Sequence, residues 1–110
     1  MQHKVVYLSG PIMDEHEGHA REWRDAAKRH LKNHFRLLDP MRRNFKDREV
    51  DSANEIVEFD LQDVRDAHII LVNYSKPSIG TSMEVFYAAH DLGKFVVGFS
   101  PFEFQECSPW

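Results

Sequence analysis

Short apolar runs alternate along the chain with longer segments in which apolar residues recur every three to four positions. Because side chains repeat every two residues in a strand and every 3.6 in a helix, the two patterns predict different elements. The apolar runs predict strands at residues 5–8, 35–38, 68–73 and 95–99. The helical spacing predicts helices at about residues 17–32, 55–66 and 82–92, the last one ended by Gly93.

This order of elements predicts an α/β fold. Strands that are apolar throughout and separated by helices indicate a parallel sheet covered on both faces. We therefore expect a single-domain, flavodoxin-like (Rossmann-like) three-layer sandwich, in which right-handed crossovers give the strand order 2-1-3-4. Ligands bind such sheets at the carboxyl ends of the strands, so the loops at residues 9–13 and 74–81 should face each other across a ligand crevice.

Composition narrows the class of ligand. The 110 residues carry a formal net charge of −4, and the 14 basic residues are dispersed apart from Arg42 and Arg43. Polymeric nucleic acid requires a basic face, so it is not expected as a partner. No apolar run is long enough for a membrane span, and the lone Cys107 fits a reducing cytoplasm. The seven histidines lack the spacing of metal ligands, so no metal site is expected.

Glu84 is the first candidate for chemistry. It follows the buried strand 68–73 and a turn containing Pro77 and Gly80, and it opens a nearly all-apolar helix. A carboxylate in apolar surroundings at the ligand crevice usually has a functional role. At a helix N-terminus the helix dipole would favour its ionised form. The alternative is a capping box, because Thr81 and Glu84 have the S/T-x-x-E spacing.

The helix at residues 55–66 supplies further candidates. On a helical wheel, Asp60 falls near the middle of the apolar arc and Asp63 inside it, and surface helices rarely bury aspartates without a reason. The alternative for both is a structural role, in which the carboxylate accepts bonds from a neighbouring segment. The apolar arc consists of Ile56, Val57, Phe59, Leu61 and Val64, and the opposite face of Glu58, Gln62 and Arg65.

Two buried carboxylates on separate helices, Glu84 and Asp60, meet at one predicted crevice. Such pairs cleave glycosidic bonds, one acting as nucleophile and the other as proton donor or substrate ligand. The transition state resembles an oxocarbenium ion, which a fixed carboxylate stabilises. This chemistry needs neither a metal nor a redox cofactor, and we expect no cofactor.

An ordered set of motifs resembles the nucleoside 2-deoxyribosyltransferase family. The motifs are V-Y-L-S-G-P-I at residues 6–12, E-F-D-L at 58–61 with D-A at 66–67, and G-T-S-M-E at 80–84 with Y-A at 87–88 and G-K at 93–94. Each is short, but they occur in the family's order and cover most of residues 4–99. The resemblance implies transfer of deoxyribose from a 2′-deoxynucleoside to a free nucleobase.

The resemblance also implies a role for each matching position. Glu84 matches the nucleophile that forms a covalent deoxyribosyl ester, and Tyr7 matches the tyrosine whose hydroxyl orients it. Asp60 matches the acid that contacts sugar or base and helps the base leave. The small residues Ser9 and Gly10, followed by Pro11, lie along the substrate. The remaining predicted substrate contacts are Asp63, Ser78 and Gly80.

Two alternatives stay open. The family includes deoxynucleoside 5′-monophosphate N-glycosidases, hydrolases whose loop before the nucleophile often reads Pro-Ser-x-Gly, as residues 77–80 do. Ser78 stands where transferases more typically carry an Asp that contacts the base, and Arg42 and Arg43 could add charge toward a 5′-phosphate. The other alternative is a non-catalytic nucleotide-binding module, since fold does not fix function.

The predicted domain, residues 1–110, is short at its C-terminus. Family members usually continue for some tens of residues past the fourth strand, with elements that often reach a neighbouring subunit's site. This chain ends at Trp110, after Phe102 and Phe104. Exposed aromatic residues favour association, so a homodimer or a higher homo-oligomer is expected.

Overall fold

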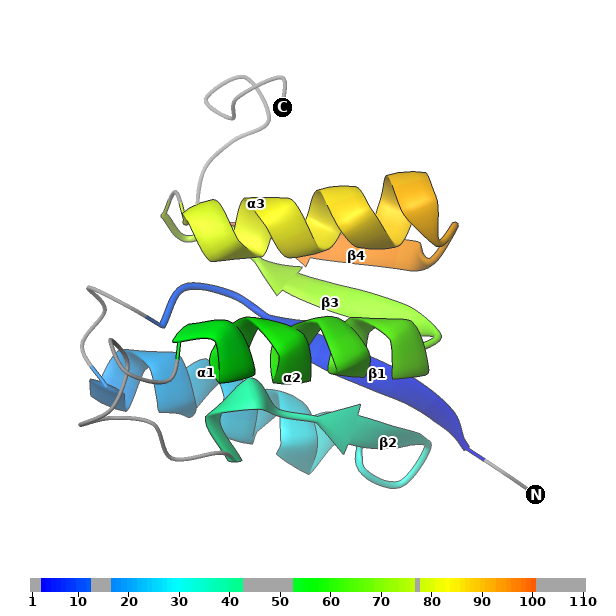
Figure 1. Ribbon diagram of the computed structural model, residues 1–110. Coiled ribbons are helices and arrows are strands. Elements are labelled where there is room, and N and C mark those ends of the chain that lie inside the picture. The colour runs from blue at the N-terminus through cyan, green and yellow to red at the C-terminus, as the bar shows by residue number, and fades with distance from the viewer. Residues whose placement is uncertain (1–2, 13–16, 43–52, 77, 101–110) are drawn as a thin grey trace.

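The computed structural model describes residues 3–12, 17–42, 53–76 and 78–100 (Figure 1). The predicted roles of Arg43 and Pro77, the free Cys107 and the aromatic terminus therefore lie outside the described residues. The elements are β1 (Lys4–Ser9), α1 (Glu17–Leu31), β2 (Phe35–Leu38), the 3₁₀ turn η1 (Pro40–Arg42), α2 (Ala53–Asp66), β3 (Ile69–Asn73), α3 (Ile79–Phe86), the π-helical turn η2 (Tyr87–Asp91) and β4 (Phe95–Phe99). None of the described helices is long and apolar enough to cross a bilayer.

The sheet confirms the predicted strand order. Its four strands are parallel and lie in the order β2-β1-β3-β4. Val6 pairs with Ile69 and Ser9 with Val72, so β1 and β3 end side by side. The switch point between them is thus at the carboxyl ends of the two central strands, where a ligand crevice is expected.

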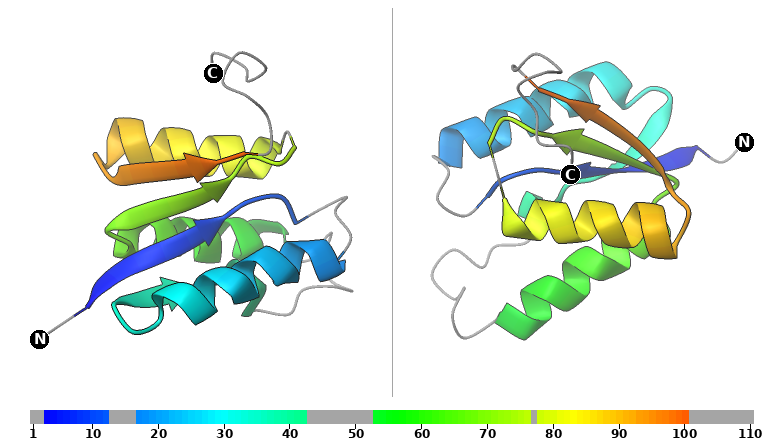
Figure 2. Two further views of the ribbon diagram at one scale, coloured as in Figure 1. Left: turned by 180° about the vertical axis from the view of Figure 1, so that it is seen from behind. Right: turned by 90° about the horizontal axis from the view of Figure 1, so that it is seen from above.

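Helices cover both faces of the sheet and make three layers. The view from above shows α1 on one face and α2 and α3 on the other (Figure 2). The main core lies between the sheet and the α2–α3 layer and contains Tyr7, Leu38, Val64, Ala67, Ile70, Val72 and Ala88. Because strand side chains alternate, Tyr7 points into this core while Val6 and Leu8 point toward α1.

The last helix begins earlier than the sequence predicted. Ser78 is its N-cap, with extended backbone angles and a hydroxyl that accepts a hydrogen bond from the Thr81 amide at 3.3 Å. Ser78 and Thr81 are both residues that can cap a helix N-terminus, and the helix starts after the first of them. Gly93 follows the π-helical turn with φ 63°, a left-handed conformation that glycine adopts without strain, as predicted for the end of this helix.

Candidate active site

Strand β1 presents two hydroxyl groups on the same face of the sheet. Tyr7 and Ser9 are two residues apart, so both side chains point toward the α2–α3 layer. Both residues are buried, at 1% and 0% exposure. Ser9 is the last residue of β1, which places its hydroxyl at the carboxyl end of the sheet.

The Glu84 carboxylate accepts a hydrogen bond from each of these hydroxyls. The Tyr7 hydroxyl donates to Glu84 Oε2 at 2.6 Å, and the Ser9 hydroxyl donates to Glu84 Oε1 at 2.9 Å. A hydrogen bond at each oxygen fixes the plane of the carboxylate and leaves lone pairs on both atoms. The structure therefore brings together three residues that the sequence separates by 75 and 77 positions.

The capping-box alternative for Glu84 is wrong. Because α3 begins at Ile79, Glu84 lies in its second turn, and its carboxylate is bonded to β1. The expectation that the helix dipole keeps this carboxylate ionised fails for the same reason, since the dipole acts within the first turn. The side chain instead reaches away from its own helix into the sheet.

Burial raises the pKa of Glu84 to about 7, the largest influence on this group. The hydrogen bond from Tyr7 lowers the pKa, the negative charge of Asp60 raises it, and the bond from Ser9 and the charge of Arg24 lower it. Burial also raises the pKa of Tyr7 well above its usual value, so the phenol stays protonated and can donate. A carboxyl group that titrates near neutrality exists in both forms at physiological pH.

Helix α2 turns its two aspartates toward the protein, as the wheel predicted. Asp63, Val64 and Ala67 are buried, and Asp60, three residues before Asp63, is partly buried. The predicted apolar arc was wrong in part, because Val57 and Phe59 are 53% and 42% exposed. The buried stripe follows the i, i+3, i+4, i+7 spacing from Asp60.

Asp63 forms an ion pair with Arg42. The Arg42 guanidinium donates two hydrogen bonds of 2.8 Å to the two carboxylate oxygens, and a third, also of 2.8 Å, to the backbone carbonyl of Asp39. The hydrogen bonds to Asp63 raise the pKa of Arg42. These contacts tie the η1 turn to α2. The substrate role predicted for Asp63 stays a prediction, and its carboxylate has a partner within the chain.

The structure places the predicted loop residues in different surroundings. Gly10 and Pro11 are buried directly after Ser9. A Cβ atom on Gly10 would stand 2.9 Å from the Trp23 ring and 3.1 Å from Asn73 Cβ, so the close packing requires glycine. A Cβ on Gly80 would meet nothing within 4 Å. Ser78 uses its hydroxyl to cap α3.

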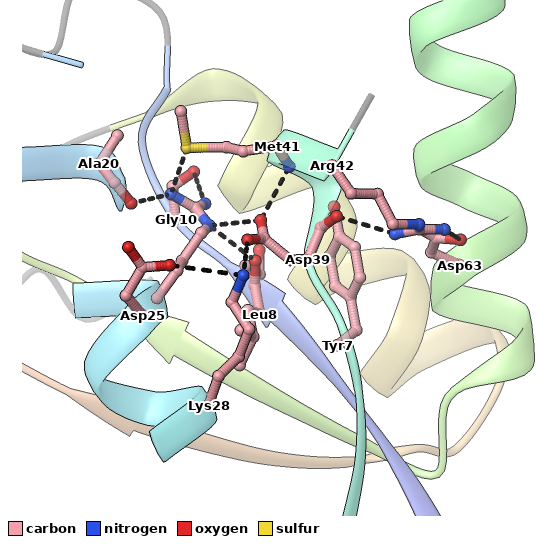
Figure 3. A network of polar contacts seen from close by, with 12 residues as sticks. Tyr7, Leu8, Gly10, Ala20, Asp25, Lys28, Asp39, Met41, Arg42 and Asp63 are labelled. Carbon is pink, nitrogen blue, oxygen red and sulfur yellow. Dashed lines mark hydrogen bonds and ion pairs between the residues drawn. The ribbon is translucent and has the colours of Figure 1, made fainter. Parts of the chain in front are cut away.

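The sequence analysis missed Arg24 and Asp39. Arg24 is fully buried, and Asp39 lies between it and Lys28, with ion pairs of 3.7 and 2.7 Å (Figure 3). The signal was present, because Arg24 falls between Ala20 and Ala27 on the apolar stripe of α1. A charged residue at a core-facing position requires partners, and Asp39 stands at the carboxyl end of β2.

A cavity of about 550 Å³ opens on the opposite face of the sheet, between α1 and the loop after β3. It is lined by residues that include Pro11, Trp23, Asn73, Ser75 and Lys76. Glu84, Tyr7 and Ser9 are not among the lining residues, because they face the α2–α3 layer. In the part of the chain that the structure describes, no three His, Cys, Asp or Glu side chains gather as a metal site.

Comparisons with known proteins agree with the fold. A family model described as nucleoside 2-deoxyribosyltransferase matches residues 6–107. The structure is similar to the 2-desoxiribosyltransferase from Leishmania mexicana, with a TM-score of 0.72 and 24% identity, covering 90% of this chain and 65% of that one. It is also similar to the 2-deoxyribosyltransferase from Bacillus psychrosaccharolyticus, with a TM-score of 0.69 and 20% identity, covering 88% and 72%. No curated protein sequence matches significantly.

Proposed function

We propose a reaction from the premise that this chain belongs to the nucleoside 2-deoxyribosyltransferase family. The protein cleaves the N-glycosidic bond of a 2′-deoxynucleoside and transfers the deoxyribose to a second nucleobase. The observation that carries this proposal is the Glu84 carboxylate, held at both oxygens by Tyr7 and Ser9. The chain spans 65% of the length of the Leishmania protein.

In the first half-reaction, an oxygen of the ionised Glu84 attacks the anomeric carbon of the sugar. A carbon–oxygen ester bond forms, the carbon–nitrogen bond breaks, and its electron pair leaves with the base, which takes up a proton. The hydroxyls of Tyr7 and Ser9 support this step because they hold the carboxylate in one orientation before the substrate arrives. A held nucleophile loses little entropy on reaching the transition state.

In the second half-reaction, a nitrogen of the incoming base attacks the same carbon. The ester bond breaks, its electron pair returns to Glu84, and the attacking nitrogen loses its proton. The raised pKa of Glu84 makes its carboxylate a stronger nucleophile for the first step, and a carboxylate is still able to leave in the second. The sugar returns to its original configuration after two displacements.

Asp60 is the proposed partner that protonates the departing base or binds the sugar. Its negative charge raises the pKa of Glu84, which supports a position close to the nucleophile. Replacement of Asp60 by Asn retains the shape and should lower turnover by about 10²-fold or more. Unchanged turnover with a lower melting temperature would assign Asp60 a structural role.

The test is incubation of the protein with deoxyinosine or deoxyuridine, with and without a second base, followed by chromatography. Transfer predicts a new deoxynucleoside only when the second base is present. Mass spectrometry of the protein with deoxynucleoside alone should detect a deoxyribosyl adduct on the peptide that contains Glu84. A protein that binds deoxynucleosides without releasing base would instead be a non-catalytic module.

The monophosphate hydrolase remains the alternative prediction, and two residues on which it rested are engaged within the chain. The Ser78 hydroxyl caps α3, and the Arg42 guanidinium is bonded to Asp63 and to the Asp39 carbonyl. These contacts favour the transferase. The same incubation with deoxynucleoside monophosphates distinguishes the two, because the hydrolase releases base from them without an acceptor.

We also propose that the protein works as a homodimer or a higher homo-oligomer. Helix α3 carries an exposed apolar stripe of Ile79, Met83 and Phe86, which are 83%, 67% and 62% exposed. Their spacing of four and three residues places them on one side of the helix. An exposed apolar patch of this kind favours association. Light scattering after size-exclusion chromatography should give a mass above 12.9 kDa, and Met83→Lys should lower it.

A further inference from the structure

Arg24 binds the segment of β1 that carries the Ser9 hydroxyl. Its Nε donates to the carbonyl of Leu8 at 3.3 Å, and its Nη2 donates to the carbonyl of Gly10 at 3.0 Å. Ser9 lies between these two residues, and its side chain points to the opposite face, where its hydroxyl donates to Glu84. The guanidinium thus contacts Leu8 and Gly10 on one side of the sheet, and Glu84 contacts Ser9, the residue between them, on the other side.

The guanidinium is itself held in place from several directions. A bond of 2.9 Å from Nη1 to the Ala20 carbonyl anchors it to its own helix, and the Trp23 ring lies 4.6 Å from its central carbon. Asp39 supplies the opposite charge at 3.7 Å and is in turn bound by Lys28. A planar group with fixed donors suits two carbonyls on one strand, and a lysine ammonium cannot reproduce this fork geometry.

We propose that Arg24 is a positioning residue that holds the carbonyl groups of Leu8 and Gly10, the residues on either side of Ser9, and thereby orients the Glu84 carboxylate for attack. This proposal rests on the function proposed above, because orientation matters only if Glu84 reacts. Arg24 acts through Ser9 and does not touch the substrate. Pairing with β3 holds β1 as far as Ser9, and the Arg24 guanidinium holds the next residue, Gly10. The hydroxyl of Ser9 is therefore fixed where the sheet ends.

Arg24 also contributes charge. The charges that act on Glu84 are those of Asp60 on α2 and Arg24 on α1, whereas Tyr7 and Ser9 on β1 act through neutral hydroxyls. The positive charge of Arg24 lowers the pKa of Glu84. Asp39 partly offsets that positive charge. The geometric and electrostatic effects can therefore be separated by replacements that change one of them.

The experiment compares Arg24→Lys, Arg24→Gln and Asp39→Asn with the wild type. Turnover and KM are measured with a deoxynucleoside, and the titration of Glu84 is followed by carboxyl ¹³C NMR of glutamate-labelled protein, its signal assigned by loss in Glu84→Gln. Arg24→Lys should lower kcat roughly 10- to 100-fold with little change in KM, because misplacement of a reacting group costs about this much. Its Glu84 should titrate near the wild-type pH.

Arg24→Gln should lower kcat similarly and move the titration of Glu84 to higher pH, because the positive charge is lost. Asp39→Asn should move that titration to lower pH, because it leaves Arg24 and Lys28 less compensated. Arg29→Gln, an exposed position on the same helix, is the matched control and should change neither quantity. A purely structural Arg24 would lower the melting temperature with kcat and the titration unchanged.

A folded Arg24→Lys protein with wild-type kcat overturns the positioning role. An unchanged Glu84 titration in Arg24→Gln overturns the electrostatic role. If the Arg24 variants do not fold, Asp39→Asn provides the test. A Glu84 titration that does not move in Asp39→Asn contradicts the coupling between Arg24 and Glu84. A wild type that releases no base refutes the proposed function, whereas the NMR titrations still report whether Arg24 acts on Glu84.

Discussion

The inward-facing carboxylates of this protein lie in two different kinds of surroundings. Asp39 and Asp63 are buried and each contacts positively charged side chains, Lys28 and Arg24 in one case and Arg42 in the other. Glu84 is bonded by two neutral hydroxyls, and the positive charge of Arg24 acts on it from the far side of the sheet.

The difference separates carboxylates held in ion pairs from Glu84, the proposed nucleophile. A carboxylate in contact with a cation ties two segments of the chain together, as Asp39 and Asp63 do. Hydroxyl donors fix orientation, yet they compensate burial only in part, so the pKa of Glu84 rises to about 7. The bonded partner, rather than burial alone, therefore distinguishes the proposed nucleophile from the other inward carboxylates.

The largest effect should come from Glu84→Gln, which keeps the size of the side chain and removes the proposed nucleophile. Turnover should fall by roughly 10³-fold or more, since the proposed ester forms on the Glu84 carboxylate. Base release by chromatography measures it, with circular dichroism to establish folding. Glu58→Gln, on the exposed face of α2, is the control. A folded Glu84→Gln protein with more than a few per cent of activity contradicts the covalent mechanism.

The raised pKa of Glu84 also predicts a dependence of stability on pH. The pKa rises from 4.5 to about 7 on folding, so the contribution is fully present below the unfolded value and is lost as pH rises through the folded one. Between pH 4 and pH 8, wild type should lose about 3 kcal/mol more of its free energy of unfolding than Glu84→Gln does. Urea denaturation of both proteins measures this. Parallel pH profiles would show that Glu84 titrates normally.

Removing the Asp63 carboxylate from its ion pair with Arg42 should affect stability more than activity. Asp63→Asn leaves Arg42 without its ionic partner, and we expect a loss of about 2 kcal/mol, below the value for a fully buried pair because Arg42 is 40% exposed. Chemical denaturation measures the loss, with the exposed Asp66→Asn as control. A raised KM in folded Asp63→Asn would instead support the substrate contact predicted from the sequence.

Removing one hydroxyl should shift the titration of Glu84. Tyr7→Phe keeps the ring in the core and deletes the 2.6 Å hydrogen bond that lowers the pKa of Glu84. The acidic limb of the pH–activity profile should move to higher pH, and turnover at pH 7 should fall about tenfold. Tyr87→Phe, which deletes an exposed hydroxyl bonded to Arg65, is the control. An unmoved limb would mean that Tyr7 only fills the core.

The smallest effect is expected for Ser78, whose hydroxyl accepts a hydrogen bond from the backbone amide of Thr81. Ser78→Ala removes the N-cap of α3 and should cost about 1 kcal/mol of stability. Titration with a deoxynucleoside and with its monophosphate should show equal changes in affinity. A larger loss for the monophosphate would support the phosphate role instead. Ser82→Ala, which leaves the cap intact, is the control.

The sheet could be predicted because the same pattern, an apolar run followed by a helical segment, is repeated along the chain. Four apolar runs with helices between them allow few topologies, and the observed order is the expected one. Tyr7 and Glu84 were candidates from motif and burial arguments, and the structure brings them into contact. The roles of these residues in a reaction stay predictions.

The errors arose where local signals compete. Ser78 and Thr81 can each cap a helix, and the structure uses Ser78, with Glu84 bonded to β1 and not to its own helix end. Arg24 looked like an ordinary charged residue of an amphipathic helix, although its position on the apolar stripe required a partner from another element. Partners distant in sequence, such as Asp39, cannot be identified from a periodic pattern alone.

The two hydroxyl bonds to Glu84 also have a consequence for folding. They join residues 75 and 77 positions apart, so the Glu84 carboxylate is oriented only after the first and third strands have paired. Contacts of such high sequence separation form late and are lost when the sheet opens. Enzymatic activity should therefore disappear in the same transition as the sheet during denaturation, and it can serve as a probe of cooperative unfolding.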